Sequence, residues 1–142
     1  LFTIETGHPN QVAPDKRPYH TLSPTMALYP SGEFAFTLGT PGGDSQTQTI
    51  LQITHNMLVF GMTPQQAIEA PRFRSLSGLR LAIEDRVSEE ALLDLRQRGH
   101  LLNLVEGWTA TFGGAHMIHH DPETGVLTAA ADPRREAYAI AY

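Results

Sequence analysis

The sequence predicts an α+β protein, because strand-like and helix-like hydrophobic patterns follow one another irregularly along its 142 residues. A β-hairpin comes first: residues 25–29 and 33–38 have strand patterns on either side of the turn Pro30-Ser31-Gly32. Two helical patterns follow directly, and a strand, a helix and two or three more strands complete the chain. This order favours helices laid on an antiparallel sheet over a regular βαβ alternation.

The chain is organised around the turn Pro41-Gly42-Gly43, which lies between the second predicted strand and a long predicted helix. Helical spacing up to Gly61 predicts one inward-facing set of side chains: Ile50, Leu51, Ile53, Thr54, Met57 and Leu58. Two glycines let the backbone approach a ligand closely, because no Cβ intervenes. They also bring amide N–H groups to the positive end of a helix, where an oxyanion would be stabilised. A tight structural turn is the alternative that spacing alone favours.

The remaining elements follow from capping and turn signals. Thr63-Pro64 predicts the start of a short helix over residues 65–70, which Pro71 ends. Ser88 predicts the cap of a further helix that stops at Gly99. The predicted strands in this half of the chain cover residues 79–84, 101–105, 115–120 and 126–131.

Composition excludes several classes of function. A formal net charge of -5 argues against a nucleic-acid or anionic-membrane surface, since either would need a basic patch. No apolar run approaches the roughly 20 residues that a membrane span requires. The absence of cysteine excludes disulfides, thiolate metal sites and cysteine nucleophiles.

Two clusters of polar residues have competing explanations. His116, His119 and His120 invite a metal, but side chains alternate on a strand, so at most two of them share a face. We therefore expect no metal site and no cofactor. The motif Asp132-Pro133-Arg134-Arg135 could clamp an anion, although an internal salt bridge is the favoured use.

Four motifs, in this order, resemble the small subunit of the γ-glutamyltransferase (γ-glutamyltranspeptidase) family. The resemblance covers nearly the whole chain, and Leu95-x-x-x-Gly99-His100 also fits it. The motifs are Lys16-Arg17-Pro18 leading to Leu22-Ser23-Pro24, then Gly39-Thr40-Pro41-Gly42-Gly43, then Glu69-Ala70-Pro71-Arg72-Phe73, and Ala131-Asp132-Pro133-Arg134-Arg135.

This resemblance implies an N-terminal-nucleophile hydrolase with a four-layer αββα sandwich. The precursor of such an enzyme cuts itself into a large and a small subunit, which stay together as a heterodimer. The new N-terminal threonine of the small subunit attacks a γ-glutamyl amide, with its own α-amine as the base. In the family the Pro-Gly-Gly turn forms the oxyanion hole, so the resemblance assigns that role to Gly42 and Gly43.

The resemblance also sets the expected extent of the chain. The family's catalytic threonine falls upstream of Leu1, so we expect residues 1–142 to be a single domain, the C-terminal portion of a small subunit. The expected partners are the upstream part of the same precursor, the large subunit and a small-molecule amide substrate. A periplasmic or secreted location would be typical of the family, although the sequence leaves the compartment open.

Three differences from the family pattern concern the substrate pocket. His20 and Thr21 replace two adjacent serines that hold the substrate's α-carboxylate, and both can donate a hydrogen bond to it. Leu1 replaces an aspartate that pairs with the substrate's α-amino group. Residues 3–18 form a loop without a long lid, which predicts an open cleft and favours hydrolysis over transfer.

Two alternatives to γ-glutamyl transfer or hydrolysis remain open. One is the same chemistry on a glutaryl, cephalosporin-type or other amide. The other is a non-catalytic homologue that keeps only the scaffold.

Overall fold

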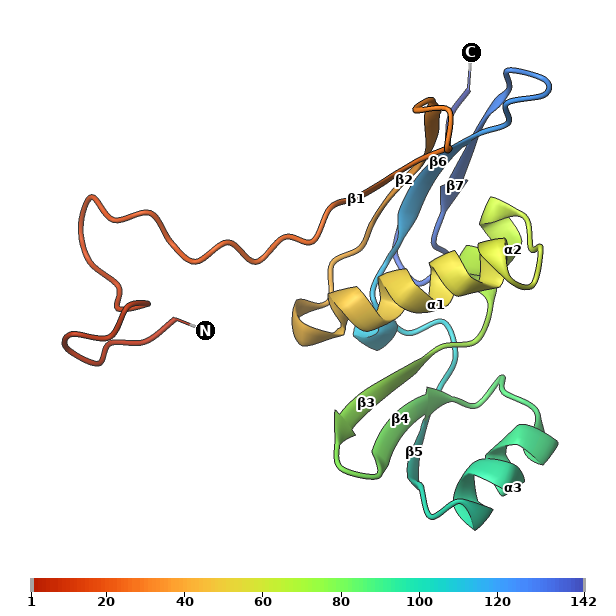
Figure 1. Ribbon diagram of the computed structural model, residues 1–142. Coiled ribbons are helices and arrows are strands. Elements are labelled where there is room, and N and C mark those ends of the chain that lie inside the picture. Colours follow the sequence, from red (N-terminus) through yellow and green to blue (C-terminus); the bar gives the residue numbers. More distant parts are fainter. Residues whose placement is uncertain (1, 142) are drawn as a thin grey trace.

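A computed structural model describes residues 2–141 and contains two β-sheets, with helix α1 lying between them and against both (Figure 1). The larger sheet has four antiparallel strands, and its order places the second strand beside the sixth. The predicted hairpin and the two last predicted strands are confirmed. In sheet order the strands are β1 (Thr25–Leu28), β2 (Phe34–Gly39), β6 (His116–His120) and β7 (Leu127–Ala131).

The smaller sheet corrects the predicted topology. Its order is β3 (Phe73–Ser77), β4 (Arg80–Glu84) and β5 (Leu101–Val105), and β5 runs parallel to β4. Helix α3 (Glu89–Gln97) connects the parallel pair, so the chain contains the βαβ unit that the sequence analysis had disfavoured. The reason lies in β4, the central strand, whose last four residues are all buried, as parallel strands require.

Strand β3 was not predicted, because most of its side chains are exposed and leave no alternating pattern. Side chains of α1 (Gln46–Leu58) complete its outer edge instead. The amide of Gln52 accepts from Phe73 N at 3.0 Å and donates to Phe73 O at 2.9 Å. Gln48 accepts from Ser75 N at 2.7 Å in the same way. An edge strand covered by helix side chains no longer exposes unpaired backbone groups.

Helices α1 and α2 (Pro64–Glu69) cover one face of the larger sheet. Ile53 and Met57 of α1 join Leu38, Met117 and other buried side chains in the core. Leu51 and Leu58, which were predicted to face inward, are instead 68% and 67% exposed. A surface helix buries one stripe of side chains, and these two residues lie outside it. The predicted cap of α2 is confirmed as a capping box.

The opposite face of the larger sheet is not covered by any described helix. By register, Met26 of β1, Thr37 of β2 and Ile118 of β6 lie in one row on this face. The exposed large apolar side chains on it are Met26, Leu28, Ile118 and Leu127. Large exposed apolar patches of this kind mark interaction surfaces.

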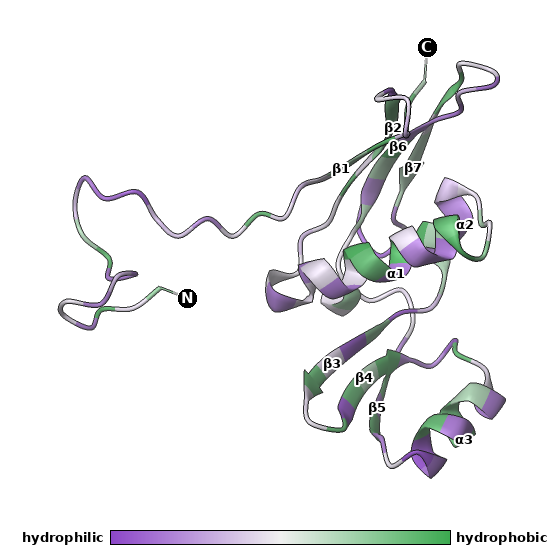
Figure 2. Ribbon diagram, in the orientation of Figure 1, coloured by the Kyte–Doolittle hydropathy of each residue, from purple (hydrophilic) through white to green (hydrophobic). Residues whose placement is uncertain are grey.

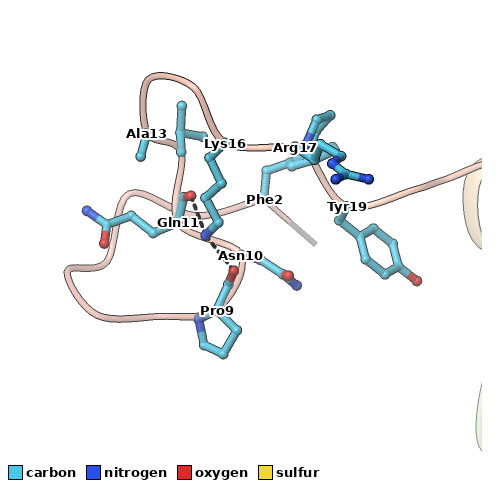
Figure 3. A pocket seen from close by; sticks show the side chains of 10 residues that line it. Phe2, Pro9, Asn10, Gln11, Ala13, Lys16, Arg17 and Tyr19 are labelled. Atoms are coloured by element: carbon cyan, nitrogen blue, oxygen red, sulfur yellow. Dashed lines mark hydrogen bonds between the residues drawn. The ribbon is translucent and has the colours of Figure 1, made fainter.

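Residues 2–24 form an N-terminal arm that contains neither a helix nor a named strand. The arm is mostly hydrophilic, in contrast to β4 and β5 (Figure 2). Near its start the arm folds into a small loop, closed by the Lys16 ammonium, which donates to Pro9 O at 2.6 Å and to Gln11 O at 3.0 Å (Figure 3). Within residues 2–141, no helix is both long and apolar enough to cross a membrane.

Candidate active site

The glycine turn leads from β2 into a short 3-10 turn, residues Gly43–Ser45, at the start of α1. Gly42 has φ 155° and Gly43 φ 53°, both in the region that favours glycine. A Cβ on Gly42 would lie only 2.7 Å from Ser45 Oγ. Ser45 N and Ser45 Oγ both donate to Gly42 O, at 3.0 and 2.7 Å. The N–H groups of Gly42 and Gly43 donate to no acceptor within residues 2–141.

Two cavities meet at this turn, and the arm segment 21–23 lines both of them. The first has a volume of about 450 Å³ and is lined by His20, Thr21 and Gly43, among others. The second, of about 540 Å³, is lined by Thr21 and Gly42, together with apolar side chains. The structure therefore brings the four residues expected from the sequence to one place, and their roles stay predictions. Leu1 lies outside the described residues.

The chemical groups around the first cavity are those of a polar binding site. Thr21 and His20 are exposed, and the side chain of neither donates a hydrogen bond within the part of the chain that the structure describes. Asp44 is the one acidic residue among the described residues that line this cavity, and no Lys or Arg lines it. The cavity thus offers the imidazole of His20, several hydroxyl groups, including that of Thr21, and one carboxylate beside the glycine turn.

Thr40 connects the turn to the loop before β6. Its Oγ1 donates to Pro41 O at 2.9 Å and accepts from Gly114 N at 3.1 Å. This loop is tied down on its other side, because Phe112 O accepts from Arg72 at 2.9 Å and Ala115 N donates to Asp132 at 2.9 Å. The turn is therefore coupled to a buried ionic network.

The ionic network contains two carboxylates and two guanidinium groups that water hardly reaches. Glu84 and Asp132 are 0% exposed, Arg72 is 2% and Arg134 is 4%. Arg134 binds both oxygens of Glu84, at 2.6 and 2.9 Å, and also Asp132 at 3.1 Å. Arg72 binds the other oxygen of Asp132 at 2.7 Å. The internal salt bridge predicted for Asp132 and Arg134 is confirmed.

The network joins both sheets to α2. Glu84 ends β4, whereas Asp132 and Arg134 follow β7. Arg134 also donates to Ile68 O and Ala70 O, each at 2.9 Å, and so satisfies carbonyl groups at the end of α2. These bonds connect the end of α2 to the ionic network.

Burial and charge act in opposite directions on the network's titratable groups. Burial opposes ionisation of Asp132, but the charge of Arg72 and the N–H groups of Ala115 and Arg134 outweigh it, so the pKa of Asp132 lies below its ordinary value. Burial lowers the pKa of Arg72, and the negative charge of Asp132 offsets part of this shift. Both arginines stay protonated at neutral pH, because an arginine pKa is far above 7. Trp108 covers the outer side, with Arg86 stacked 3.7 Å from its ring centroid.

The histidines and the N-terminal loop are weaker candidates for a functional site. Within residues 2–141, no group of three His, Cys, Asp or Glu side chains is placed to hold a metal ion. His120 Nδ1 instead lies 3.0 Å from Phe34 O. A cavity of about 180 Å³ inside the N-terminal loop has no lining residue from the glycine turn (Figure 3).

Known proteins resemble this chain over its whole length. The whole chain, residues 1–142, matches the family model described as Gamma-glutamyltranspeptidase. The chain belongs to the γ-glutamyltranspeptidase family. The predicted resemblance is thereby confirmed.

Individual members of the γ-glutamyltranspeptidase family and their structural relatives refine the comparison. The chain is 36% identical over 147 residues to the glutathione hydrolase-like YwrD proenzyme of Bacillus subtilis (strain 168), covering 99% of this chain and 27% of that protein. It is 30% identical to the oxamate amidohydrolase proenzyme of Klebsiella pneumoniae, over 99% of this chain and 27% of the relative. The chain thus spans about a quarter of the length of these relatives.

A solved structure supports the fold as well as the family. The cephalosporin acylase from Bacillus halodurans superposes with a TM-score of 0.80 and 32% identity, over 94% of this chain and 24% of that chain. The predicted fold class, α+β in the manner of N-terminal-nucleophile hydrolases, is confirmed.

Three residues that shape the site had no role in the sequence-based prediction: Thr40, Asp44 and Gln46. Thr40 and Asp44 flank the predicted glycines, and adjacency to the turn was a signal that could have singled them out. Gln46 binds the arm through a contact 25 residues away in the chain, for which local sequence carries no signal.

Replacing Asp132 by asparagine should destabilise the protein by about 3–5 kcal/mol, because it leaves Arg72 and Arg134 buried without a full countercharge. Urea unfolding measures this loss. The matched control is Asp94→Asn, which breaks a pair with Arg98 whose side chains are 53% and 69% exposed. This control should change the unfolding midpoint very little, and equal losses in both variants would contradict the assignment.

The pH dependence provides a second readout for Asp132. A carboxylate with a lowered folded-state pKa stabilises the protein above its ordinary pKa of 3.8, and this stability is lost as the pH falls through the folded value. Wild-type protein should therefore lose stability more steeply below pH 3.8 than Asp132→Asn does. Parallel acid profiles would contradict a lowered pKa at this residue.

Proposed function

We propose that this chain, as one domain of residues 1–142, is the C-terminal portion of the small subunit of an amidohydrolase that acts on γ-glutamyl amides. The observation that carries the proposal is the pair of N–H groups at Gly42 and Gly43, which donate to no acceptor among the described residues and lie beside the cavities that Thr21 lines. The similarity to a glutathione hydrolase-like proenzyme and to an amidohydrolase proenzyme supports it.

The proposed chemistry is acyl transfer through a covalent intermediate. A threonine in the preceding part of the precursor, freed by self-cleavage, attacks the γ-glutamyl carbonyl carbon, and its own α-amine accepts the hydroxyl proton. The carbonyl oxygen becomes an oxyanion that accepts hydrogen bonds from Gly42 and Gly43. The amine leaves with a proton, and water then hydrolyses the ester that remains. Thr21 and His20 donate hydrogen bonds to the distal carboxylate of the acyl group and so keep its carbonyl group at the glycine turn.

The rest of the precursor is the proposed partner. The relatives are about four times as long as this chain, which leaves room for a large subunit and an upstream segment. The uncovered sheet face, with Met26, Leu28, Ile118 and Leu127, has the apolar character that such a partner would bury. A second helix-covered sheet packed there would complete the αββα sandwich.

We further propose hydrolysis rather than transfer as the main outcome. The loop of residues 3–18 has no long lid, and the arm contains no helix that could close over the glycine turn. An open cleft admits water to the acyl-enzyme, whereas exclusion of water would favour an amine acceptor.

Asp44 favours an acyl group that carries an ammonium. Asp44 lines the cavity next to Gly43, to which the described residues contribute no Lys or Arg. A γ-glutamyl group has an α-ammonium for this carboxylate, and a glutaryl group does not. An acylase for larger amides is the second candidate, supported by the apolar wall of the other cavity at Leu22, Pro24 and Pro41 and by the likeness to cephalosporin acylase.

Gly42→Ala should lower kcat for γ-glutamyl-p-nitroanilide by about 100-fold, because the new Cβ overlaps Ser45 Oγ and displaces the oxyanion donors. Steady-state kinetics of the full-length protein measure the effect, and KM should change far less. Gly32→Ala is the control, since Gly32 also has a positive φ, of 89°, but an added Cβ contacts nothing. Equal losses of kcat in both variants would exclude the oxyanion role.

Asp44→Asn should reduce kcat/KM for γ-glutamyl-p-nitroanilide by about fivefold and leave glutaryl-p-nitroanilide nearly unchanged, because only the former has an ammonium. The two substrates differ in this group alone, so activity on the glutaryl substrate is the internal control for each variant. A preference of wild-type protein for the glutaryl substrate, unaltered by the substitution, would favour the acylase alternative.

A further inference from the structure

Glutamine side chains in this chain repeatedly bind backbone edges through both atoms of the amide. Gln48 and Gln52 bind β3 in this way, and Gln65 binds Ala131 at the edge of β7, at 3.0 and 3.1 Å. Each of these amides occupies the place that a neighbouring strand would take. Gln46 makes the same kind of contact, but its partner is the arm segment beside the glycine turn.

The contacts of Gln46 are specific and largely buried. Its Nε2 donates to Thr21 O at 2.8 Å, and its Oε1 accepts from Ser23 N at 3.1 Å. The residue is only 8% exposed. On the other side its stem lies against the turn, because a Cβ on Gly42 would be 3.9 Å from Gln46 Cγ. One side chain therefore contacts both halves of the candidate site.

No other hydrogen bond fixes this part of the arm. Within residues 2–141, the two bonds to Gln46 are the only hydrogen bonds that residues 17–24 form. These residues also lie outside every helix and strand. The position of Thr21 relative to the turn thus depends on the Gln46 amide.

We propose that Gln46 is a positioning residue that sets the distance between the oxyanion turn and the carboxylate-binding segment, and so selects the length of the acyl group. The proposal rests on the function proposed above. A substrate whose carbonyl oxygen lies at Gly42 and Gly43 must reach Thr21 with its distal carboxylate. A small error in the distance between the glycine turn and Thr21 strongly weakens binding of a substrate that must contact both. Gln46 acts through the backbone of the segment, which its amide holds at Thr21 O and Ser23 N.

Gln46→Met tests this role in the full-length protein, because methionine keeps the shape of the side chain and removes both hydrogen bonds. KM for γ-glutamyl-p-nitroanilide should rise about tenfold, with kcat little changed, since the loss falls on carboxylate binding. The matched control is Gln48→Met, the same substitution on the same helix, which releases Ser75 and should leave KM unchanged. Gln46→Glu, which keeps the acceptor for Ser23 N, should give an intermediate KM.

Hydrogen exchange supplies a readout that does not depend on activity. The Ser23 amide should exchange faster in Gln46→Met than in wild-type protein, and Gln48→Met should leave it unchanged. Unaltered exchange at Ser23, or equal KM values in both methionine variants of an active enzyme, would overturn this inference alone. Wild-type protein that is inactive on both γ-glutamyl and glutaryl anilides would overturn the proposed function, and this inference with it.

Discussion

The buried network of Glu84, Arg134, Asp132 and Arg72 is the constraint on which the rest of the structure depends. Each group gives up hydration that only its partners replace, so the four must stay together in one geometry. They come from the end of β4, the segment after β7 and the segment after α2. The network therefore fixes one sheet relative to the other, which apolar packing, being non-directional, would do less specifically.

The same constraint extends to the candidate site. Arg72 and Asp132 hold the loop that precedes β6, and this loop binds Thr40, which in turn binds the carbonyl group of Pro41. Oxyanion stabilisation requires donors that are already in place, because reorganisation during the reaction would cost part of the gain. The arm is held differently, by one glutamine amide. We infer a rigid oxyanion turn opposite an adjustable carboxylate segment, which would let related enzymes change substrate without changing the turn.

Local patterns in the sequence predicted most elements, whereas the family resemblance supplied the candidate site residues, whose roles stay predictions. The hairpin, α1, the capped α2 and the last two strands follow from spacing, turns and caps over a few residues. The topology of the smaller sheet did not follow, because the parallel pairing of β4 and β5 depends on burial and not on local pattern. Leu51 and Leu58 fit the predicted helical spacing, yet they lie outside the stripe that α1 buries and are exposed. Gly42, Gly43, His20 and Thr21 were chosen from ordered motifs, whereas the contact of Gln46 with Thr21 spans 25 residues, a distance that local sequence patterns do not encode.

The most direct measurement is the intact mass of the full-length precursor, before and after incubation. Two fragments, the smaller beginning at a threonine upstream of Leu1, would show the self-cleavage that creates the nucleophile for the turn at Gly42 and Gly43. A precursor that stays uncut would contradict the proposed enzyme. It would leave this chain as a scaffold that keeps the family fold and uses its glycines only as a turn.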